Sequence, residues 1–123
     1  MTNGSGSQNL VLWLRAMEFS TAALDLCSHI DPALRTTLLV DQIEALVKNL
    51  SPMILYAGKE ARPAESSQLY LSARANLLEA LRLFDDLENL NWVSESQNKY
   101  LHEQSGFLET SMNQQIKLLQ REK

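Results

Sequence analysis

The side chains with reactive chemistry are few, and the first to consider are Cys27, His29 and His102. A zinc site needs several nitrogen or sulfur ligands that converge on one point. Neither histidine has another histidine or cysteine at ligand spacing, so the sequence predicts no metal centre. His29 lies near the end of a predicted helix, where an imidazole complements the negative end of the helix dipole.

Cys27 would act as a nucleophile only with a general base beside it. His29 is two residues away and faces another direction on a helix, so we predict a buried, structural cysteine. A single cysteine allows no disulfide within the chain, which favours a reducing compartment and predicts a cytoplasmic protein.

The densest acidic group is Asp85, Asp86 and Glu88. Such a group can hold a cation, but at the end of a helix it is more often solvated surface, which is our prediction. Glu79 and Arg82 are spaced for a surface ion pair. The di-iron signature of helical bundles, a Glu followed three residues later by His on two helices, is missing. With no glycine-rich phosphate loop and no triad, we predict a non-enzyme with no catalytic residue, metal or cofactor.

The net charge of the chain is −4, from 15 acidic and 11 basic residues. This balance opposes binding to nucleic acid and to anionic membranes, both of which need clustered positive charge, and it favours a protein partner. Two small basic groups remain, Lys59 with Arg62 in a predicted loop and Lys117 with Arg121 near the C-terminus. We take these four residues as the candidate contacts to nucleic acid or to a protein partner.

Four segments with helical spacing, separated by three breaks, predict an all-α, antiparallel up-down four-helix bundle. The segments are residues 9–29, 33–57, 64–90 and a last helix that begins at Ser94. The breaks are Asp31-Pro32, residues 58–63 and residues 89–94. We expect residues 9–123 to form this single domain, and residues 1–8 to be a flexible tail or the remnant of an expression tag. No apolar run approaches the ~20 residues of a membrane span, so no membrane partner is expected.

The spacing of apolar residues predicts one buried stripe on each helix. For the first segment the stripe is Leu10, Trp13, Met17, Ser20, Leu24 and Cys27, with Leu14 and Ala16 flanking it. For the second it is Leu39, Ile43, Leu46, Leu50, Ile54 and Ala57, with Leu38 and Val47 widening it. For the last two they are Leu71, Leu78, Leu81, Phe84 (or Leu87) and Leu90, then Tyr100, Leu101, Gln104, Phe107, Leu108, Met112, Ile116 and Leu119.

Single residues also predict how the helices bend and end. Pro52 predicts a kink at residues 48–51, and Gly58 is the expected C-cap of the second helix. Ser94 with Gln97 predicts a capping box. Gly106 lies inside the last helix, where it indicates either close packing against a neighbour or simple tolerance.

Several of these landmarks occur in the same order in a known family. They are the opening Leu12-Trp13-Leu14-Arg15-Ala16-Met17, the turn at Pro32, Asp41-Gln42-Ile43, Gly58, the third helix with Ala73, Leu77, Glu79 and Leu81-Arg82-Leu83, and the turn Asn89–Ser94. The chain resembles the bacterial four-helix proteins encoded in 23S rRNA intervening sequences and their relatives, the accessory variability determinant (Avd) proteins of diversity-generating retroelements.

This resemblance, which spans about residues 9–120, implies a four-helix protomer, a ring-shaped homopentamer and no catalytic residues. In the retroelement branch it implies binding to a reverse transcriptase and to nucleic acid through a basic surface. That branch is typically basic, whereas this chain is acidic. We therefore expect a homo-oligomeric scaffold that docks a protein partner, with a nucleic-acid-binding accessory protein as the alternative.

Overall fold

A computed structural model describes the backbone of residues 3–121 and the side chains of residues 9–34 and 38–121. Every regular element of residues 3–121 is helical, which confirms the predicted all-α fold. The elements are α1 (Asn3–Ser28), the 3-10 helix η1 (Pro32–Thr37), α2 (Leu39–Lys48), α3 (Leu50–Lys59), α4 (Pro63–Asn89) and α5 (Glu95–Arg121). Within the same residues, no helix combines the length and the apolar character that crossing a membrane requires.

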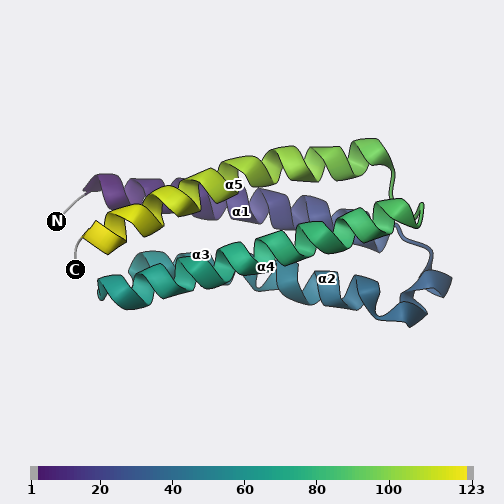
Figure 1. Ribbon diagram of the computed structural model, residues 1–123, viewed down its shortest axis with the longest axis horizontal. Helices are drawn as coiled ribbons and strands as arrows, with labels where there is room; N and C mark the ends of the chain where they lie inside the picture. Colours follow the sequence, from purple (N-terminus) through teal and green to yellow (C-terminus); the bar gives the residue numbers. More distant parts are fainter. Residues whose placement is uncertain (1–2, 122–123) are drawn as a thin grey trace.

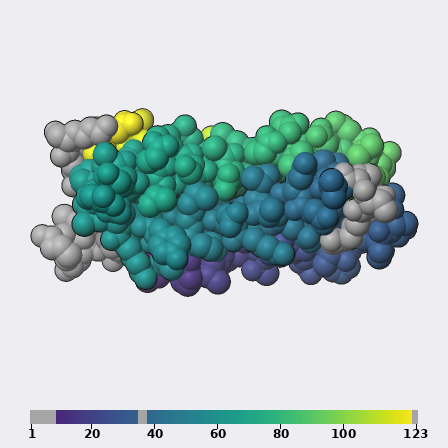
Figure 2. Space-filling view, turned by 90° about the horizontal axis from the view of Figure 1, so that it is seen from below, coloured from purple at the N-terminus to yellow at the C-terminus, as the bar shows by residue number. Residues whose placement is uncertain are grey.

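The helices form an elongated bundle of four columns, in which α2 and α3 together make one column (Figure 1). Helix α1 packs against α3 and α5, and α4 also packs against α3 and α5, so α1 and α4 are diagonal partners. The chain runs the length of the bundle four times and reverses between columns (Figure 1). In Figure 2, α2, α3 and α4 close into a continuous surface on one side.

Helix α1 begins at Asn3, within the stretch predicted as a flexible tail. Of that stretch, residues 1–2 lie outside the described residues, and the side chains of residues 3–8 are not described. Its mobility therefore stays a prediction.

The second predicted helix begins later than expected and is broken once. Residues 32–37 form η1, Leu38 has a left-handed φ of 66°, and α2 starts only at Leu39. The start predicted at Ala33 is therefore wrong, because the turn capped by Asp31 closes as a 3-10 helix first. The predicted kink is confirmed: α2 ends at Lys48 and α3 restarts at Leu50, where Pro52 cannot complete the hydrogen-bond ladder.

The core follows the bundle axis and is built from aliphatic, aromatic and small side chains. Its members are Leu12, Ala16, Phe19, Ala23, Cys27, Ile30, Val40, Ile43, Val47, Leu50, Ile54, Ala57, Tyr70, Ala73, Leu77, Ala80, Leu81, Leu83, Phe84, Leu87, Val93, Leu101, Leu108, Met112 and Ile116. The predicted stripe was most accurate in α2 and α3.

On α1 the predicted stripe was wrong at two positions. Leu10 and Met17 are exposed, whereas Leu12 and the flanking Ala16 are buried. Ser20 and Cys27 are buried as predicted, and Trp13 and Leu24 pack against the core. Residues 10–17 are apolar on every side of the helix apart from Arg15, so several stripes fit equally well. The true stripe is rich in alanine, which lets neighbouring helices approach closely.

The same kind of error affects α4 and α5. Leu78 on α4 and Leu90 just after its end are exposed, whereas Leu77 is buried. On α5, Tyr100 and Phe107 were expected in the core, but both are more than half exposed. Leu101 and Leu108, each one residue further on, do lie in the core as predicted.

The capping box at the start of α5 is confirmed. The backbone N–H of Gln97 donates to the Ser94 hydroxyl at 3.1 Å, and the backbone N–H of Ser94 donates to the Gln97 amide oxygen at 2.8 Å. Gly58 is not the C-cap: it has no positive φ, and α3 continues to Lys59. Gly106 was predicted to pack closely or to be merely tolerated, and an added Cβ there meets nothing within 4 Å.

Gly58 instead makes room for Asn9, whose side chain would overlap a Cβ at this position. The Asn9 amide donates to the backbone oxygen of Ile54 at 3.3 Å and to the Tyr70 hydroxyl at 2.6 Å. This one side chain therefore joins α1 to α3 and α4, and glycine at position 58 is what lets it reach them.

We expect Gly106→Ala to stabilise the fold by up to about 1 kcal/mol, the difference in helix propensity. Gly58→Ala gains the same propensity but displaces Asn9 and breaks two hydrogen bonds, at roughly 1 kcal/mol each, so it should destabilise by about 1 kcal/mol. Urea unfolding measures both changes. In an Asn9→Ala background Gly58→Ala should become stabilising; equal destabilisation in both backgrounds would contradict the proposed contact.

Tyr70 makes the fold sensitive to alkali. Burial raises the pKa of Tyr70 above its usual 10, and the hydrogen bond with Asn9 offsets part of that rise. The unfolded chain then loses this proton at a lower pH than the folded chain, so stability falls as pH rises above 10. Tyr70→Phe should flatten that fall in pH-dependent urea unfolding, by up to about 1.4 kcal/mol per pH unit. An equally steep fall in Tyr70→Phe would contradict this account.

Candidate functional site

The reactive side chains identified in the sequence do not converge. Cys27 is fully buried, as predicted. His29 is exposed at the end of α1, with its Nδ1 2.8 Å from the backbone oxygen of Asp25. Among the residues that the structure describes, no group of three or more His, Cys, Asp or Glu is placed to hold a metal ion.

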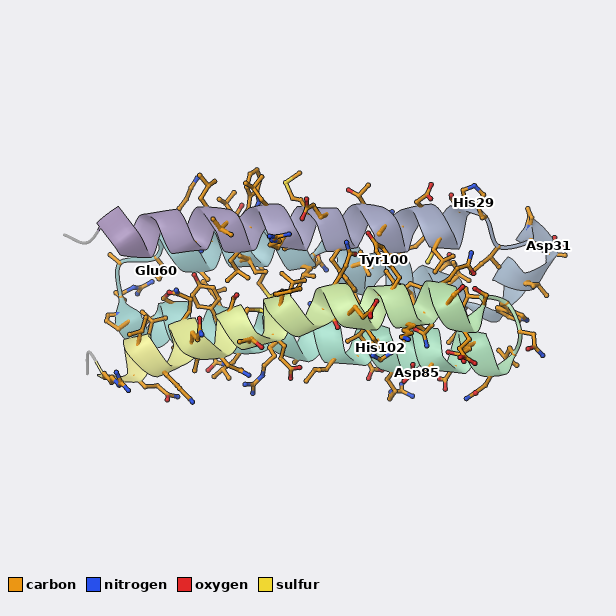
Figure 3. All side chains as sticks on the ribbon, turned by 90° about the horizontal axis from the view of Figure 1, so that it is seen from above. His29, Asp31, Glu60, Asp85, Tyr100 and His102 are labelled. Atoms are coloured by element: carbon orange, nitrogen blue, oxygen red, sulfur yellow. The ribbon has the colours of Figure 1, made fainter. Side chains whose placement is uncertain are left out.

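The acidic group ties the end of α4 to the start of α5. The Asn98 amide donates to Asp85 and to Glu88, both at 2.8 Å, and the His102 Nε2 donates to the same Asp85 oxygen at 2.8 Å. Asp85 itself is exposed, and Figure 3 shows it with His102 on the side of α5 away from α1. Asn98 is buried, and nothing in its spacing identified it beforehand as the link between two carboxylates.

The two predicted basic groups lie at the same end of the bundle. Lys59 and Arg62 flank the connection between α3 and α4, and Lys117 and Arg121 occupy the last turns of α5, which end beside that connection (Figure 1). All four side chains are exposed. The structure therefore brings together two patches that are 55 residues apart in sequence, counted from Arg62 to Lys117.

Arg62 is largely occupied by its own loop. Its guanidinium donates to both oxygens of Glu60, at 3.0 and 3.1 Å, and it lies 3.8 Å from Glu65. These hydrogen bonds, with the nearby positive charge, lower the pKa of Glu60 from 4.5 to about 2. Glu60 is therefore ionised at neutral pH, and it cancels much of the positive charge that Arg62 brings to this end.

Apolar surface is concentrated on α1 and α5. Of the eleven large hydrophobic side chains exposed among the described residues, seven belong to these two helices. They are Leu10, Val11, Leu14, Met17, Tyr100, Phe107 and Leu118. Phe107 has the largest exposed fraction, at 70%. Val11, Tyr100 and Phe107 line one seam between α1 and α5, and exposed apolar side chains that gather in one place mark interaction surfaces more often than isolated ones do.

A groove runs along the seam between these two helices, and Figure 3 looks down onto it, with Tyr100 labelled beside the seam. Three hollows follow one another along it. We call this seam the α1–α5 groove. The residues that line its hollows include Val11, Arg15, Glu18, Ala22, Asp25, Gln97, Tyr100, Glu103, Gln104, Phe107, Ser111 and Gln114.

Phe107 stands at the middle of the groove. The Arg15 guanidinium lies 6.0 Å from the centre of its ring, at the limit of a cation–π contact, and 3.5 Å from Glu18. Further along, the Gln104 amide donates to the Tyr100 hydroxyl at 2.9 Å. The Gln104 amide oxygen is buried and has no hydrogen-bond partner among the described residues. The groove therefore combines exposed aromatic rings, a residue type enriched at protein interfaces, with one buried amide oxygen that has no hydrogen-bond partner among the described residues.

Comparison with protein-family models, with curated proteins and with solved structures finds no match. The groove was not predicted from the sequence, although a signal for it was present. Residues 10–17 are apolar around the whole helix, and a helix with that composition is normally covered on all sides. Only part of α1 is covered within this bundle, which leaves Val11 and Leu14 exposed.

Proposed function

We propose that this chain is a non-enzymatic, homo-oligomeric scaffold that associates with itself through the α1–α5 side of the bundle and docks a protein partner. The observation that carries the proposal is the exposure of Phe107 and Tyr100 on α5 and of Val11 on α1, which line the same groove. Burying each such side chain on association contributes roughly 1.5–3 kcal/mol when burial is complete.

The two aromatic residues of this surface, together with one arginine, support an interface. Tyrosine, phenylalanine and arginine are enriched at protein interfaces, and Tyr100, Phe107 and Arg15 meet on this side. Among the residues that line these hollows, no catalytic groups converge on one point. This favours a protein over a small substrate as what binds there.

The resemblance to the intervening-sequence and retroelement accessory proteins supplies the finer part of the proposal. It implies five copies in a ring and, in the retroelement branch, a reverse transcriptase as the docked partner. The number of copies and the identity of the partner rest on that resemblance alone.

The mass of the protein in solution tests the proposal directly. Light scattering coupled to size exclusion, at micromolar concentration, should give a mass of several copies rather than the 13.9 kDa of one chain. A mass of one copy at concentrations up to 100-fold higher would refute self-association. Pull-down with a purified reverse transcriptase from the same genomic neighbourhood then tests the partner.

A nucleic-acid-binding accessory protein is the second candidate, favoured by the gathering of Lys59, Arg62, Lys117 and Arg121 at one end. Such binding is strongest at low salt, because it releases counterions from the phosphates. An electrophoretic shift with single-stranded and duplex RNA and DNA at low salt tests it. Loss of the shift in Lys117→Glu/Arg121→Glu would support this candidate, and the absence of any shift with the unaltered protein would remove it.

A further inference from the structure

We infer that the copies associate head to tail, with an exposed ridge on α1 of one copy packed into the α1–α5 groove of the next copy. We define the α1 ridge as Leu10, Leu14 and Met17. This inference rests on the proposed self-association and gives it a geometry. Because the ridge and the groove are different surfaces of one chain, a pair of copies leaves one of each uncovered, and copies add until a ring closes.

The α1 ridge is a single row on the surface of the helix. Leu10, Leu14 and Met17 are four and three residues apart, the spacing that places side chains one above another on a helix. All three are exposed, and none of them lines a hollow of the groove. Figure 3 shows side chains that stand free along the side of α1 away from α5. A row with this spacing is the element that inserts between two neighbouring helices when helices pack.

The ridge and the groove occupy adjoining sides of α1. Each ridge residue is followed directly by a residue that lines the groove, namely Val11, Arg15 and Glu18. Neighbouring residues of an α-helix are turned by about 100°, so the two sides face directions that differ by about this angle. In a ring of parallel copies, the two contact surfaces of one copy differ by about 90° for four copies and about 108° for five. The contact therefore closes a small ring and is compatible with the five copies proposed above, without fixing that number.

The ridge and the groove also lie at the same level of the bundle, which favours a second copy as the occupant of the groove. Rotation about an axis parallel to the helices shifts no copy along that axis, so contacting residues must lie at equal heights. Arg15 lies beside Phe107, and Leu14 is only one residue, about 1.5 Å, from Arg15 along the helix. Leu14 of one copy therefore meets Phe107 of the next copy near the centre of the contact, where the residues that dominate binding are usually found.

The charges at this level suit an uncharged ridge. Thr21 continues the row four residues after Met17, so this side of α1 carries no charge from residue 10 to residue 21. In the groove, Arg15 and Glu18 lie 3.5 Å apart and offset each other. A charged ridge would lose its hydration here without gaining a partner. Glu103, further along the groove, lies close to the level of the exposed Thr21, whose hydroxyl is an available donor.

The contact is large enough because every copy uses both of its surfaces. The row from Leu10 to Thr21 is about 17 Å long at 1.5 Å per residue, and the two helices that receive it are about 18–20 Å wide. Two such contacts cover roughly 600–700 Å² of each copy, within the ~600–1,000 Å² per partner that stable interfaces bury. Asp25, the first charged residue beyond Thr21 on this side, is exposed and bounds the contact.

Disulfide cross-linking between engineered cysteines tests this contact. Ser111 lines the same hollow as Val11, and Leu10 adjoins Val11, so Leu10 of one copy lies at the level of Ser111 of the next copy. We expect Leu10→Cys and Ser111→Cys, refolded together from urea so that the copies mix, to form cross-linked pairs on mild oxidation, detected on a non-reducing gel. Each variant alone should cross-link at least tenfold less, because it supplies only one side of the contact. The native Cys27 is fully buried, and the unaltered chain measures any contribution from it.

Each other outcome has a definite meaning when combined with the solution mass. Cross-linking of Ser111→Cys alone as strong as in the mixture would show that two grooves face each other, and would overturn the inference. A mass of several copies without cross-linking in the mixture would also overturn it, but would leave self-association standing. A mass of one copy would refute both.

Discussion

Phe107→Glu is expected to separate the assembly into single, folded copies. The substitution removes the ring with the largest exposed fraction and places a carboxylate at the centre of the surface. Association would have to bury this carboxylate against another copy, so the lost contact and the cost of desolvating the charge act in the same direction. We expect the dissociation constant to rise at least about thirtyfold, the change that corresponds to the loss of one dominant contact. Analytical ultracentrifugation over a concentration series measures it.

Tyr56→Glu is the matched control, because Tyr56 has a similar exposed fraction, 65% against 70%, but lies on α3. It should leave the mass distribution unchanged. Circular dichroism should show unaltered helix content for both variants, since neither side chain belongs to the core. If Tyr56→Glu dissociates the assembly and Phe107→Glu does not, the interface lies on the α3 side and not in the α1–α5 groove.

Phe84→Ala is expected to cause the largest loss of stability, about 3–5 kcal/mol, the usual cost of truncating a buried phenylalanine. The ring is fully buried five residues before the end of α4, a helix that packs against α2, α3 and α5. A loss of this size approaches the whole stability of many small domains. Urea unfolding in a Phe107→Glu background measures it without a contribution from association.

The control for that experiment is Tyr56→Ala, which also truncates an aromatic ring, but at an exposed position. It should change the unfolding free energy by no more than about 0.5 kcal/mol. A comparable loss in both variants would mean that the packing around Phe84 does not determine stability, and it would contradict the assignment of Phe84 to the core.

The helices and their breaks were predictable because local chemistry determines them. Pro52 interrupts a hydrogen-bond ladder wherever it lies, and Ser94 with Gln97 satisfies the same backbone groups in any helix that they begin. The break after α3 was predicted at the right place, although Gly58, the expected C-cap, instead makes room for Asn9. Local signals therefore gave the number and order of the helices.

Which side of each helix faces the core was harder to predict, because that depends on what the helix packs against. On α1 the apolar residues surround the axis, and the buried side follows small residues such as Ala16 and Ala23, whose burial has only a weak signature in sequence. The exposed Phe107 was assigned to the core for the same reason. That error hid the candidate site, since a ring wrongly expected inside the bundle cannot be recognised as part of its surface.

The contacts between distant residues could not have been predicted. Asn9 reaches Tyr70 across 61 positions of sequence, and only the folded bundle shows why Gly58 must lack a side chain. The gathering of Lys59 and Arg62 with the end of α5 likewise depends on the direction in which the last helix returns.

Cys27 can serve as a native reporter of local opening in the bundle. Its side chain is fully buried between helices, so an aromatic disulfide reagent reaches it only when α1 separates from its neighbours. Under conditions where closing is fast, the rate of thiol labelling measures the population of that open form. Association through the α1–α5 groove should hold α1 in place and slow this labelling as protein concentration rises. One native atom, the Cys27 Sγ, would then read out assembly without any added probe.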